Sequence, residues 1–207
     1  MVGIVNIEIN GSSVRAKEGL TILEAAQYAG VEIPTLCYNE ETEHNSSCRM
    51  CSVEIEKRGR RRIVAACSYP VEEGLRINTD TDKINRIRKT ILELAAVGSG
   101  PVVASTMSAL SSVYKADLSR FSSRVPTEDS KCILCGLCVN RCKEATYDGV
   151  IGFVGRGVER RIVRFPELME ACASCNYCYS VCPTGRITST GPVPKFPTLN
   201  EVLSGRK

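Results

Sequence analysis

Cysteines are the residues of this chain most able to do chemistry, because the sequence contains twelve of them in three groups of four. Two groups have the spacing C-x2-C-x2-C-x3-C, and the third is C-x10-C-x2-C-x15-C. Four thiolates are what an iron–sulfur cluster requires, and the spacing of the two similar groups is typical of paired [4Fe–4S] clusters. The pattern therefore predicts a protein that carries electrons.

The spacing also predicts which cysteines share a cluster. In repeated C-x2-C-x2-C-x3-C runs, the fourth cysteine normally ligates the other cluster. We therefore expect one [4Fe–4S] cluster on Cys132, Cys135, Cys138 and Cys182, and a second on Cys142, Cys172, Cys175 and Cys178. The remaining group is expected to hold a [2Fe–2S] cluster and consists of Cys37, Cys48, Cys51 and Cys67.

Disulfides and zinc are the alternative uses of so many cysteines. Six disulfides would suit a secreted protein, but the chain begins directly with strand-like residues and shows no apolar leader. Zinc ribbons use two C-x2-C pairs per ion, not three successive cysteines plus a distant fourth. We therefore expect reduced thiols in the cytoplasm. No membrane span is expected, since no stretch approaches about 18 uninterrupted apolar residues.

Composition is compatible with one or two compact domains. The 207 residues are 43% hydrophobic and 5% aromatic, without Trp, and carry a formal charge of +4. Three oxidised clusters with their thiolates would bring that charge to about −2. The positive formal charge therefore does not indicate a nucleic-acid partner. Bound metal is expected to supply part of the stability that a hydrophobic core otherwise supplies.

Residues 1–79 are predicted to form a small module with two hairpins and one helix. Asn10-Gly11 is a strong signal for a two-residue turn after a strand that ends at Ile9. Thr21 and Glu24 form a capping-box pattern that begins a helix, and Gly30 is expected to end it. A second hairpin is expected from Val53 to Cys67, turning at Arg58-Gly59.

A second amphipathic helix is predicted at residues 80–97, capped by Asp80 or Thr81 and stopped by Gly98. Its apolar stripe is expected to be Ile84, Ile87, Ile91 and Leu94, and its outer face Lys83, Arg86, Arg88 and Lys89. The Ser-rich connector, which completes the segment 80–130, is expected to contain one short helix between Val102 and Leu118.

Residues 131–190 contain both similar cysteine runs and are predicted to form one domain. Between the runs we expect a hairpin of Val150–Val154 and Val158–Phe165, turning at Gly155-Arg156-Gly157. A dinucleotide-binding loop is the alternative for these glycines, but the strand–turn–helix context is missing. The tail, 191–207, contains three prolines and is predicted to be extended.

Three stretches of the N-terminal half resemble the amino-terminal [2Fe–2S] domain of the large iron–sulfur subunit of respiratory complex I, and of iron-only and NAD-linked hydrogenases. They are Thr21–Ala26, Ile33–Tyr38 and Cys48–Glu54. The resemblance continues through Cys67 and resumes from Cys132 to about Thr190. It implies an α+β protein, in which a β-grasp [2Fe–2S] ferredoxin-like domain precedes a bacterial-type two-[4Fe–4S] ferredoxin-like domain.

Two departures from those families narrow the expectation. Residues 98–130 contain neither His nor Cys, so the cubane bound by one His and three Cys is expected to be absent. The chain also ends where the hydrogenases continue into their catalytic domain, so we expect no catalytic centre and no catalytic residues.

The resemblance implies an electron-transfer subunit between a flavin- and NAD(P)-binding partner and a hydrogenase-type catalytic subunit, with ferredoxin as a further partner and electron bifurcation as an option. Alternatives are the same role in an NAD(P)–ferredoxin transhydrogenase or a formate dehydrogenase complex, and a free-standing multi-cluster ferredoxin. A redox sensor acting on nucleic acid is the weakest alternative, because no recognition motif is present.

Two further features have more than one interpretation. His44 lies four residues before Cys48. It is either functional, as a Rieske-like ligand or a proton-coupled modulator of the cluster, or a solvated loop residue, which we favour. The basic run Lys57–Arg62 could bind phosphates, form a charged hairpin end, or dock an acidic partner.

Overall fold

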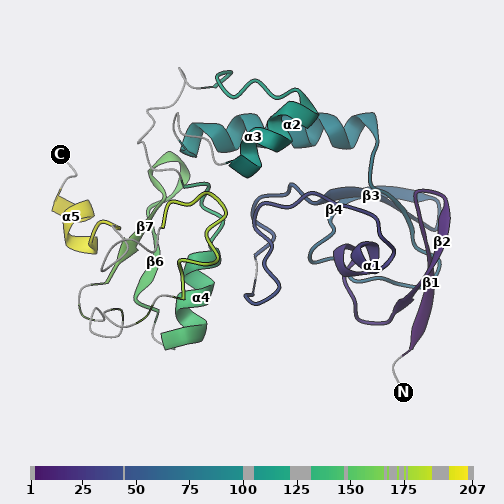
Figure 1. Ribbon diagram of the computed structural model, residues 1–207, viewed down its shortest axis with the longest axis horizontal. Helices are drawn as coiled ribbons and strands as arrows, with labels where there is room; N and C mark the ends of the chain where they lie inside the picture. Colours follow the sequence, from purple (N-terminus) through teal and green to yellow (C-terminus); the bar gives the residue numbers. More distant parts are fainter. Residues whose placement is uncertain are drawn as a thin grey trace.

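The computed structural model shows two lobes joined along one side by a long helix (Figure 1). It describes residues 3–43, 45–99, 105–121, 132–146, 149–165, 167, 172, 175, 177–187 and 196–204. His44 therefore lies outside the described residues, and its two interpretations stay open. The predicted α+β class is confirmed by the presence of helices and sheets in both lobes.

The N-terminal lobe is a five-stranded sheet in the order β2-β1-β5-β3-β4. Its strands are β1 (Ile4–Ile9), β2 (Ser12–Lys17), β3 (Ser52–Lys57), β4 (Arg60–Ala65) and β5 (Arg76–Asn78). Strands β1 and β5 pair in parallel, whereas the other pairs are antiparallel. Helix α1 (Ile22–Tyr28) packs its buried side against this sheet, so the lobe has one continuous apolar core.

Local sequence signals account for the turns and the first helix. Asn10 and Gly11 have φ of 51° and 82°, and Arg58 and Gly59 have 51° and 73°. Two successive left-handed residues make the turn type that matches the twist of a hairpin. Both predicted turns are therefore confirmed. The capping box at α1 is present too, because Thr21 and Glu24 exchange backbone-to-side-chain hydrogen bonds.

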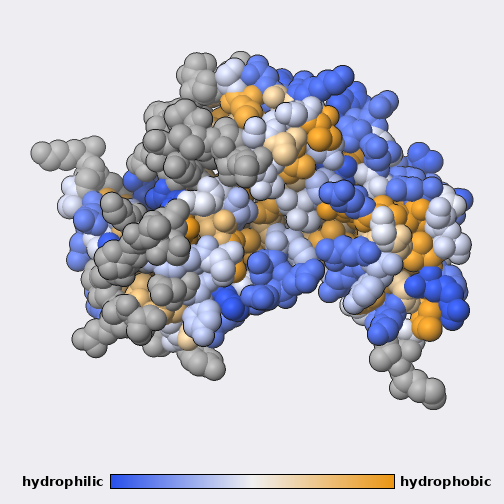
Figure 2. Space-filling model, in the orientation of Figure 1, coloured by the Kyte–Doolittle hydropathy of each residue, from blue (hydrophilic) through white to orange (hydrophobic). Residues whose placement is uncertain are grey.

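Helix α2 (Asp82–Ser99) follows the sheet, and the prediction of its faces is wrong in two places. Thr81 caps it by accepting from the Ile84 amide, but Gly98 lies inside its last turn. Arg88, expected on the outer face, is 2% exposed, whereas Leu94, expected in the apolar stripe, is 55% exposed. The solvent side of α2 is otherwise hydrophilic (Figure 2).

The reason is that α2 has two neighbours and buries a wider face than one stripe. It packs against β3 on one side and against α3 (Ser105–Tyr114) on another. Arg88 donates to the carbonyls of Met50 and Ser52 and to the Tyr114 hydroxyl, at 3.2, 3.0 and 3.2 Å. A buried guanidinium is tolerated where its donors find acceptors. Helix α3 confirms the short helix expected in the connector.

Glu93 is the second buried charge of α2, and it binds the segment that follows α3. It is completely buried, and its carboxylate accepts from Arg120 Nη1 at 2.7 Å and from the Asp117 amide at 3.3 Å. Lys89 Nζ lies 3.9 Å away. These partners compensate the desolvated carboxylate, so residues 117–120 of the connector are held against α2.

The C-terminal lobe contains α4 (Leu137–Thr146) and the hairpin of β6 (Ile151–Val154) and β7 (Arg161–Arg164). The predicted return strand from Val158 is wrong, because a 3-10 turn, Gly157–Glu159, intervenes. This turn brings the Glu159 carbonyl oxygen to 2.6 Å from where a Cβ on Gly155 would lie. Only glycine fits there, so the connection curls back before β7 begins.

The predicted extended tail is also wrong over its described part. Residues Leu199–Ser204 form α5, and Thr198 and Glu201 make a capping box at its start. The Pro197 carbonyl accepts from the Arg164 amide, and Phe196 is buried in the core of the lobe. The three prolines favoured an extended assignment, but the tail folds back because Phe196 fills an apolar site. Among the described residues, no helix is long and apolar enough to cross a membrane.

Replacing Arg88 should weaken the N-terminal lobe. An Arg88→Leu change leaves two buried carbonyls without a donor, which should lower the free energy of unfolding by about 2–4 kcal/mol. The urea concentration at which visible cluster absorption is lost measures this effect. Arg86→Leu, on the exposed side of the same helix, is the control and should change it by less than about 0.5 kcal/mol. Equal effects of both changes would contradict the role assigned to Arg88.

Candidate metal centres

The first cysteine group meets beside the ends of β3 and β4 that lie opposite their turn. Cys37 lies in the loop after α1, Cys48 and Cys51 precede β3, and Cys67 follows β4. The Cys48 amide donates to the Cys37 sulfur at 3.4 Å, and the Cys51 and Cys67 sulfurs lie 3.3 Å apart. Three of the four cysteines are buried, and Cys48 is half-buried. The structure thus brings together all four cysteines of the group.

The backbone of this loop is turned so that its amides face the sulfurs. Ser46 and Arg49 have φ of 50° and 61°, and the Met50 amide donates to the Cys48 sulfur at 3.4 Å. Arg88 holds the Met50 carbonyl on the opposite side. A loop with amides turned inward and carbonyls fixed outward favours an anionic group within it.

Hydrogen bonds between the sulfurs shift the ionisation of this group. The bond shared with Cys37 lowers the pKa of Cys48, and the same bond raises the pKa of Cys37. The bond with Cys67 raises the pKa of Cys51. Without metal, Cys37 and Cys51 therefore retain their protons at neutral pH, and binding of iron must release them.

The other eight cysteines line two neighbouring cavities in the C-terminal lobe. One cavity is lined by Cys132, Cys135, Cys138 and Cys182, together with apolar residues such as Ile162 and Phe196. The other is lined by Cys142, Cys172, Cys175 and Cys178, with Val150 and Ile151. Each lining contains the four cysteines that the crossed pattern assigns to one cluster.

Helix α4 explains how two cavities come to be adjacent. Cys138 and Cys142 are one helical turn apart, so both project from the same side of α4. Cys138 lines the first cavity and Cys142 the second. Burial raises the pKa of Cys135 to about 11 and that of Cys178 to about 12. These thiols become anionic at neutral pH only when a cation compensates them.

The loop before α4, like the cysteine loop of the N-terminal lobe, has left-handed residues and an amide that donates to a cysteine sulfur. Leu134 and Gly136 have φ of 54° and 85°, and the Leu134 amide donates to the Cys132 sulfur at 3.4 Å. A Cβ on Gly136 would lie 3.2 Å from Asn45 Nδ2 and 3.4 Å from the Phe153 ring. Glycine therefore lets the loop approach the N-terminal lobe closely.

The donor set fits iron–sulfur clusters. Every site offers four thiols, buried or half-buried, and the structure contains no disulfide between the twelve cysteines. Among the described residues, no three His, Cys, Asp or Glu side chains converge closely enough for a single metal ion. In the C-terminal lobe the sulfurs instead surround a space, which suits a polynuclear cluster ligated by cysteine.

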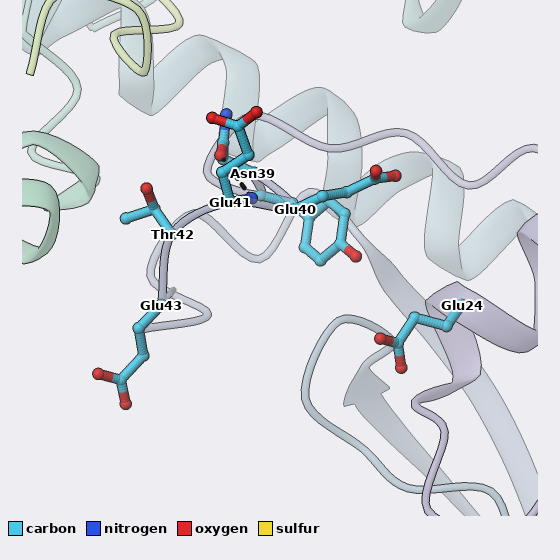
Figure 3. Close-up of a pocket in the computed structure, with 7 residues that line it drawn as sticks. Glu24, Asn39, Glu40, Glu41, Thr42 and Glu43 are labelled. Carbon is cyan, nitrogen blue, oxygen red and sulfur yellow. Dashed lines mark hydrogen bonds between the residues drawn. The ribbon is translucent and has the colours of Figure 1, made fainter. Parts of the chain in front are cut away.

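A separate acidic pocket beside the first group does not add a cation site. It is lined by Glu24, Tyr38 and the loop of residues 39–43. Figure 3 shows that the carboxylates of Glu24, Glu40, Glu41 and Glu43 point in different directions. Glu24 is moreover engaged by the cap of α1. This pocket has no convergent ligand set.

The two lobes are clamped together next to the cysteine sites. Arg141 Nη1 donates to the Glu41 carbonyl at 3.0 Å and to Glu144 at 3.3 Å. Glu144 accepts from the Glu43 amide at 2.8 Å, and Asn140 donates to the Glu43 carbonyl at 2.7 Å. These contacts fix the loop before Cys48 against α4, which carries cysteines of both cavities.

The clamp brings the first cysteine group close to the first cavity. The charge of Cys48 contributes to the raised pKa of Cys135, although burial is the largest cause. No pattern in the sequence indicates the clamp, because Asn140, Arg141 and Glu144 have the spacing of an ordinary polar helix face. Arg88 was missed for the same reason. Only the contacts across the two lobes show what these polar residues do.

Comparison with known families supports the two kinds of site. A model described as a 2Fe-2S iron-sulfur cluster binding domain matches residues 4–82. A 4Fe-4S dicluster domain matches residues 126–189. The two matches include all twelve cysteines, and they agree with the two lobes of the structure.

Curated relatives match most of the length of this chain. The NADPH-Fe(3+) oxidoreductase subunit alpha of Geobacter sulfurreducens is 32% identical over 205 residues, which cover 90% of this chain and 24% of the relative. The NADP-reducing hydrogenase subunit HndD of Solidesulfovibrio fructosivorans is 30% identical, covering 90% and 36%. The NADH-ubiquinone oxidoreductase 75 kDa subunit of Reclinomonas americana is 31% identical, covering 90% and 29%.

A solved structure matches over nearly its full length. A chain in the crystal structure of an NAD+-reducing [NiFe]-hydrogenase in the H2-reduced state has a TM-score of 0.74 and 26% identity. The match covers 93% of this chain and 90% of that one. By contrast, the chain spans roughly a quarter to a third of the curated relatives (24%, 36% and 29%).

The fold and the sites define an iron–sulfur protein with a [2Fe–2S] domain followed by a [4Fe–4S] dicluster domain. The chain is homologous to the N-terminal part of the complex I 75 kDa subunit and to subunits of NAD(P)-reducing hydrogenases. The resemblance stated from the sequence is therefore confirmed. The ligation of individual clusters stays a prediction.

The pairing of cysteines can be tested by iron content. If Cys132 and Cys182 share a cluster, Cys132→Ala, Cys182→Ala and the double variant should each lose about four irons. The double variant Cys132→Ala/Cys142→Ala should instead lose about eight, because it damages both clusters. Iron and acid-labile sulfide assays of anaerobically purified protein measure this. Uncrossed ligation would reverse the two double-variant results.

Proposed function

We propose that this chain is an electron-transfer subunit that holds one [2Fe–2S] and two [4Fe–4S] clusters. Each cluster would supply a centre that accepts and releases single electrons. The residues that would hold them are the three sets of four cysteines described above. The observation that carries the proposal is the convergence of every set at a buried or half-buried site within one connected structure.

The protein's own residues would tune and shield the three centres. Amides of Met50 and Leu134 donate to the sulfurs of Cys48 and Cys132, which stabilises the anionic form of the first cysteine group and of the first cavity. Apolar residues such as Ile162 and Phe196 exclude water from the first cavity. The clamp formed by Asn140, Arg141 and Glu144 keeps the separation between the lobes constant.

The partners are inferred from the relatives. We infer a flavin- and NAD(P)-binding subunit on one side and a hydrogenase-type catalytic subunit on the other, because similar chains occur in NADP-reducing and NAD+-reducing hydrogenases. A second candidate keeps the relay and changes the catalytic partner. It is favoured by the Geobacter relative, whose name states NADPH-Fe(3+) oxidoreductase.

Iron analysis and EPR of the holo-protein test the proposed relay. About ten irons per chain are expected, with separate [2Fe–2S] and [4Fe–4S] signals after reduction. Signals of both kinds should also appear when NADH or NADPH is added to the purified complex. They should not appear when the same nucleotide is added to the isolated chain. A chain that purifies alone from its source at native concentration would contradict the role as a subunit.

The clamp should be needed for a constant distance between the lobes. An Arg141→Gln change removes the contact with the Glu41 carbonyl, and hydrogen exchange at the Glu43 amide should become about tenfold faster. Return of the reduced [2Fe–2S] signal to its oxidised form through the complex should slow, because electron tunnelling decays steeply with distance. Lys143→Gln, on the exposed side of α4, is the control and should leave both rates unchanged. Unchanged exchange in Arg141→Gln would show that the clamp is not needed.

A further inference from the structure

The free edge of the N-terminal sheet carries an unusual distribution of charge. Strand β4 is the last strand of the sheet, and among the described residues no further strand pairs with it. Its first three residues, Arg60, Arg61 and Arg62, are all exposed. An exposed edge strand presents unpaired amides and carbonyls, which can accept a strand from another chain.

The two sides of this hairpin differ in how their charges are compensated. Side chains alternate along β3 and β4, so Arg61 shares one side with Glu54 and Glu56, which lie 3.8 and 3.0 Å away. On the other side Lys57 pairs with Glu72. Arg60 and Arg62, on that same side, contact no carboxylate of a described residue, and neither does Arg58 in the turn.

A groove runs along the side of the hairpin that carries Arg60 and Arg62. Its lining consists of Ile55, Lys57, Arg58, Arg60, Arg62 and Tyr69, which we call the basic edge groove. Ile55 is buried and Tyr69 is half-buried against the core, so the groove has an apolar floor. Its rim is cationic. A surface of this kind fits an extended segment whose acidic side chains face the groove.

We propose that the basic edge groove docks an extended acidic segment of a partner subunit, added to the sheet beside β4. This inference rests on the proposed function as a subunit of a complex. Guanidinium groups bind carboxylates in a planar, two-pronged geometry, which gives the three free arginines a specific ligand chemistry.

The linear spacing of the arginines favours an extended segment over a phosphate group. Arg60 and Arg62 are two residues apart on a strand, about 6.6 Å along its axis. A paired strand presents every second side chain at the same interval, so acidic residues at alternate positions match the two guanidinium groups. A phosphate would need these donors to converge on one point.

The opposite edge of the same sheet offers a matched control. Strand β2 is also an edge strand, and it carries Arg15 and Lys17 as exposed cations. Neither residue lines the acidic pocket, the two cysteine cavities or the basic edge groove. Arg60→Gln/Arg62→Gln and Arg15→Gln/Lys17→Gln therefore remove the same charge from the two edges of one sheet.

The test is a calorimetric titration of the cluster-loaded chain with a peptide of alternating Glu and Val. Binding should be seen at low salt and should weaken when salt is raised, since exposed charges are screened. Arg60→Gln/Arg62→Gln should bind about tenfold more weakly, whereas Arg15→Gln/Lys17→Gln should bind like the unchanged protein. A peptide of alternating Lys and Val should not bind.

Several outcomes would overturn the proposal. Equal losses in both double variants would mean that only net charge matters. Equal competition by inorganic phosphate would indicate a phosphate site. Self-association of Arg60→Gln/Arg62→Gln with unchanged peptide binding would mean that the arginines only prevent pairing of β4 with a second copy of the chain. Visible absorption and iron content report separately on the clusters, so a failed titration with intact clusters would reject the docking site and leave the relay standing.

Discussion

Burial of cysteine sulfurs is the constraint on which the rest of this structure depends. A buried thiol resists ionisation, as the raised pKa values of Cys135, Cys138 and Cys178 show. A set of four thiolates is therefore stable only around a cation, and the local backbone must favour the anionic group that results. The left-handed residues Arg49 and Leu134 meet this need in both lobes, because they turn amides toward the sulfurs.

The same constraint explains why α2, the helix that joins the lobes, buries a charged side chain. When amides turn toward a cluster site, the neighbouring carbonyls turn away and need donors of their own. Arg88 supplies them from α2 to Met50 and Ser52. A single buried guanidinium thus links the connecting helix to the first site, and Glu93 links the same helix to the segment after α3.

In the proposed role as a relay subunit, different surfaces of the two lobes would carry out different tasks. The first cysteine group and the first cavity lie toward the junction of the lobes, where the clamp of Asn140, Arg141 and Glu144 restricts relative motion. The basic edge groove lies at the free edge of the sheet, on the side away from β5. Docking at that edge would hold a partner without disturbing the backbone around the cysteines.

Much of the fold and of the sites could be predicted from the sequence where the signal is local. Asn10-Gly11, Arg58-Gly59 and the Thr21–Glu24 capping box act within four residues of chain, and the structure contains all of them. The faces of α2 could not be predicted, because a periodic pattern does not show that a helix has two neighbours. The tail was misread since its prolines are a local signal, whereas the burial of Phe196 is a distant contact.

The sequence by itself determined the kind of chemistry, because twelve cysteines in three spaced sets restrict the ligands to cluster-forming thiols. It also determined the two domain types, through spacing that a family shares. The same spacing also predicted that Cys182 lies with Cys132, and both line one cavity of the folded repeat. Only the tertiary structure decided that Arg88 is buried and that Arg60 and Arg62 are left uncompensated. Such outcomes depend on which partners the fold brings within reach, and no spacing along the chain encodes them.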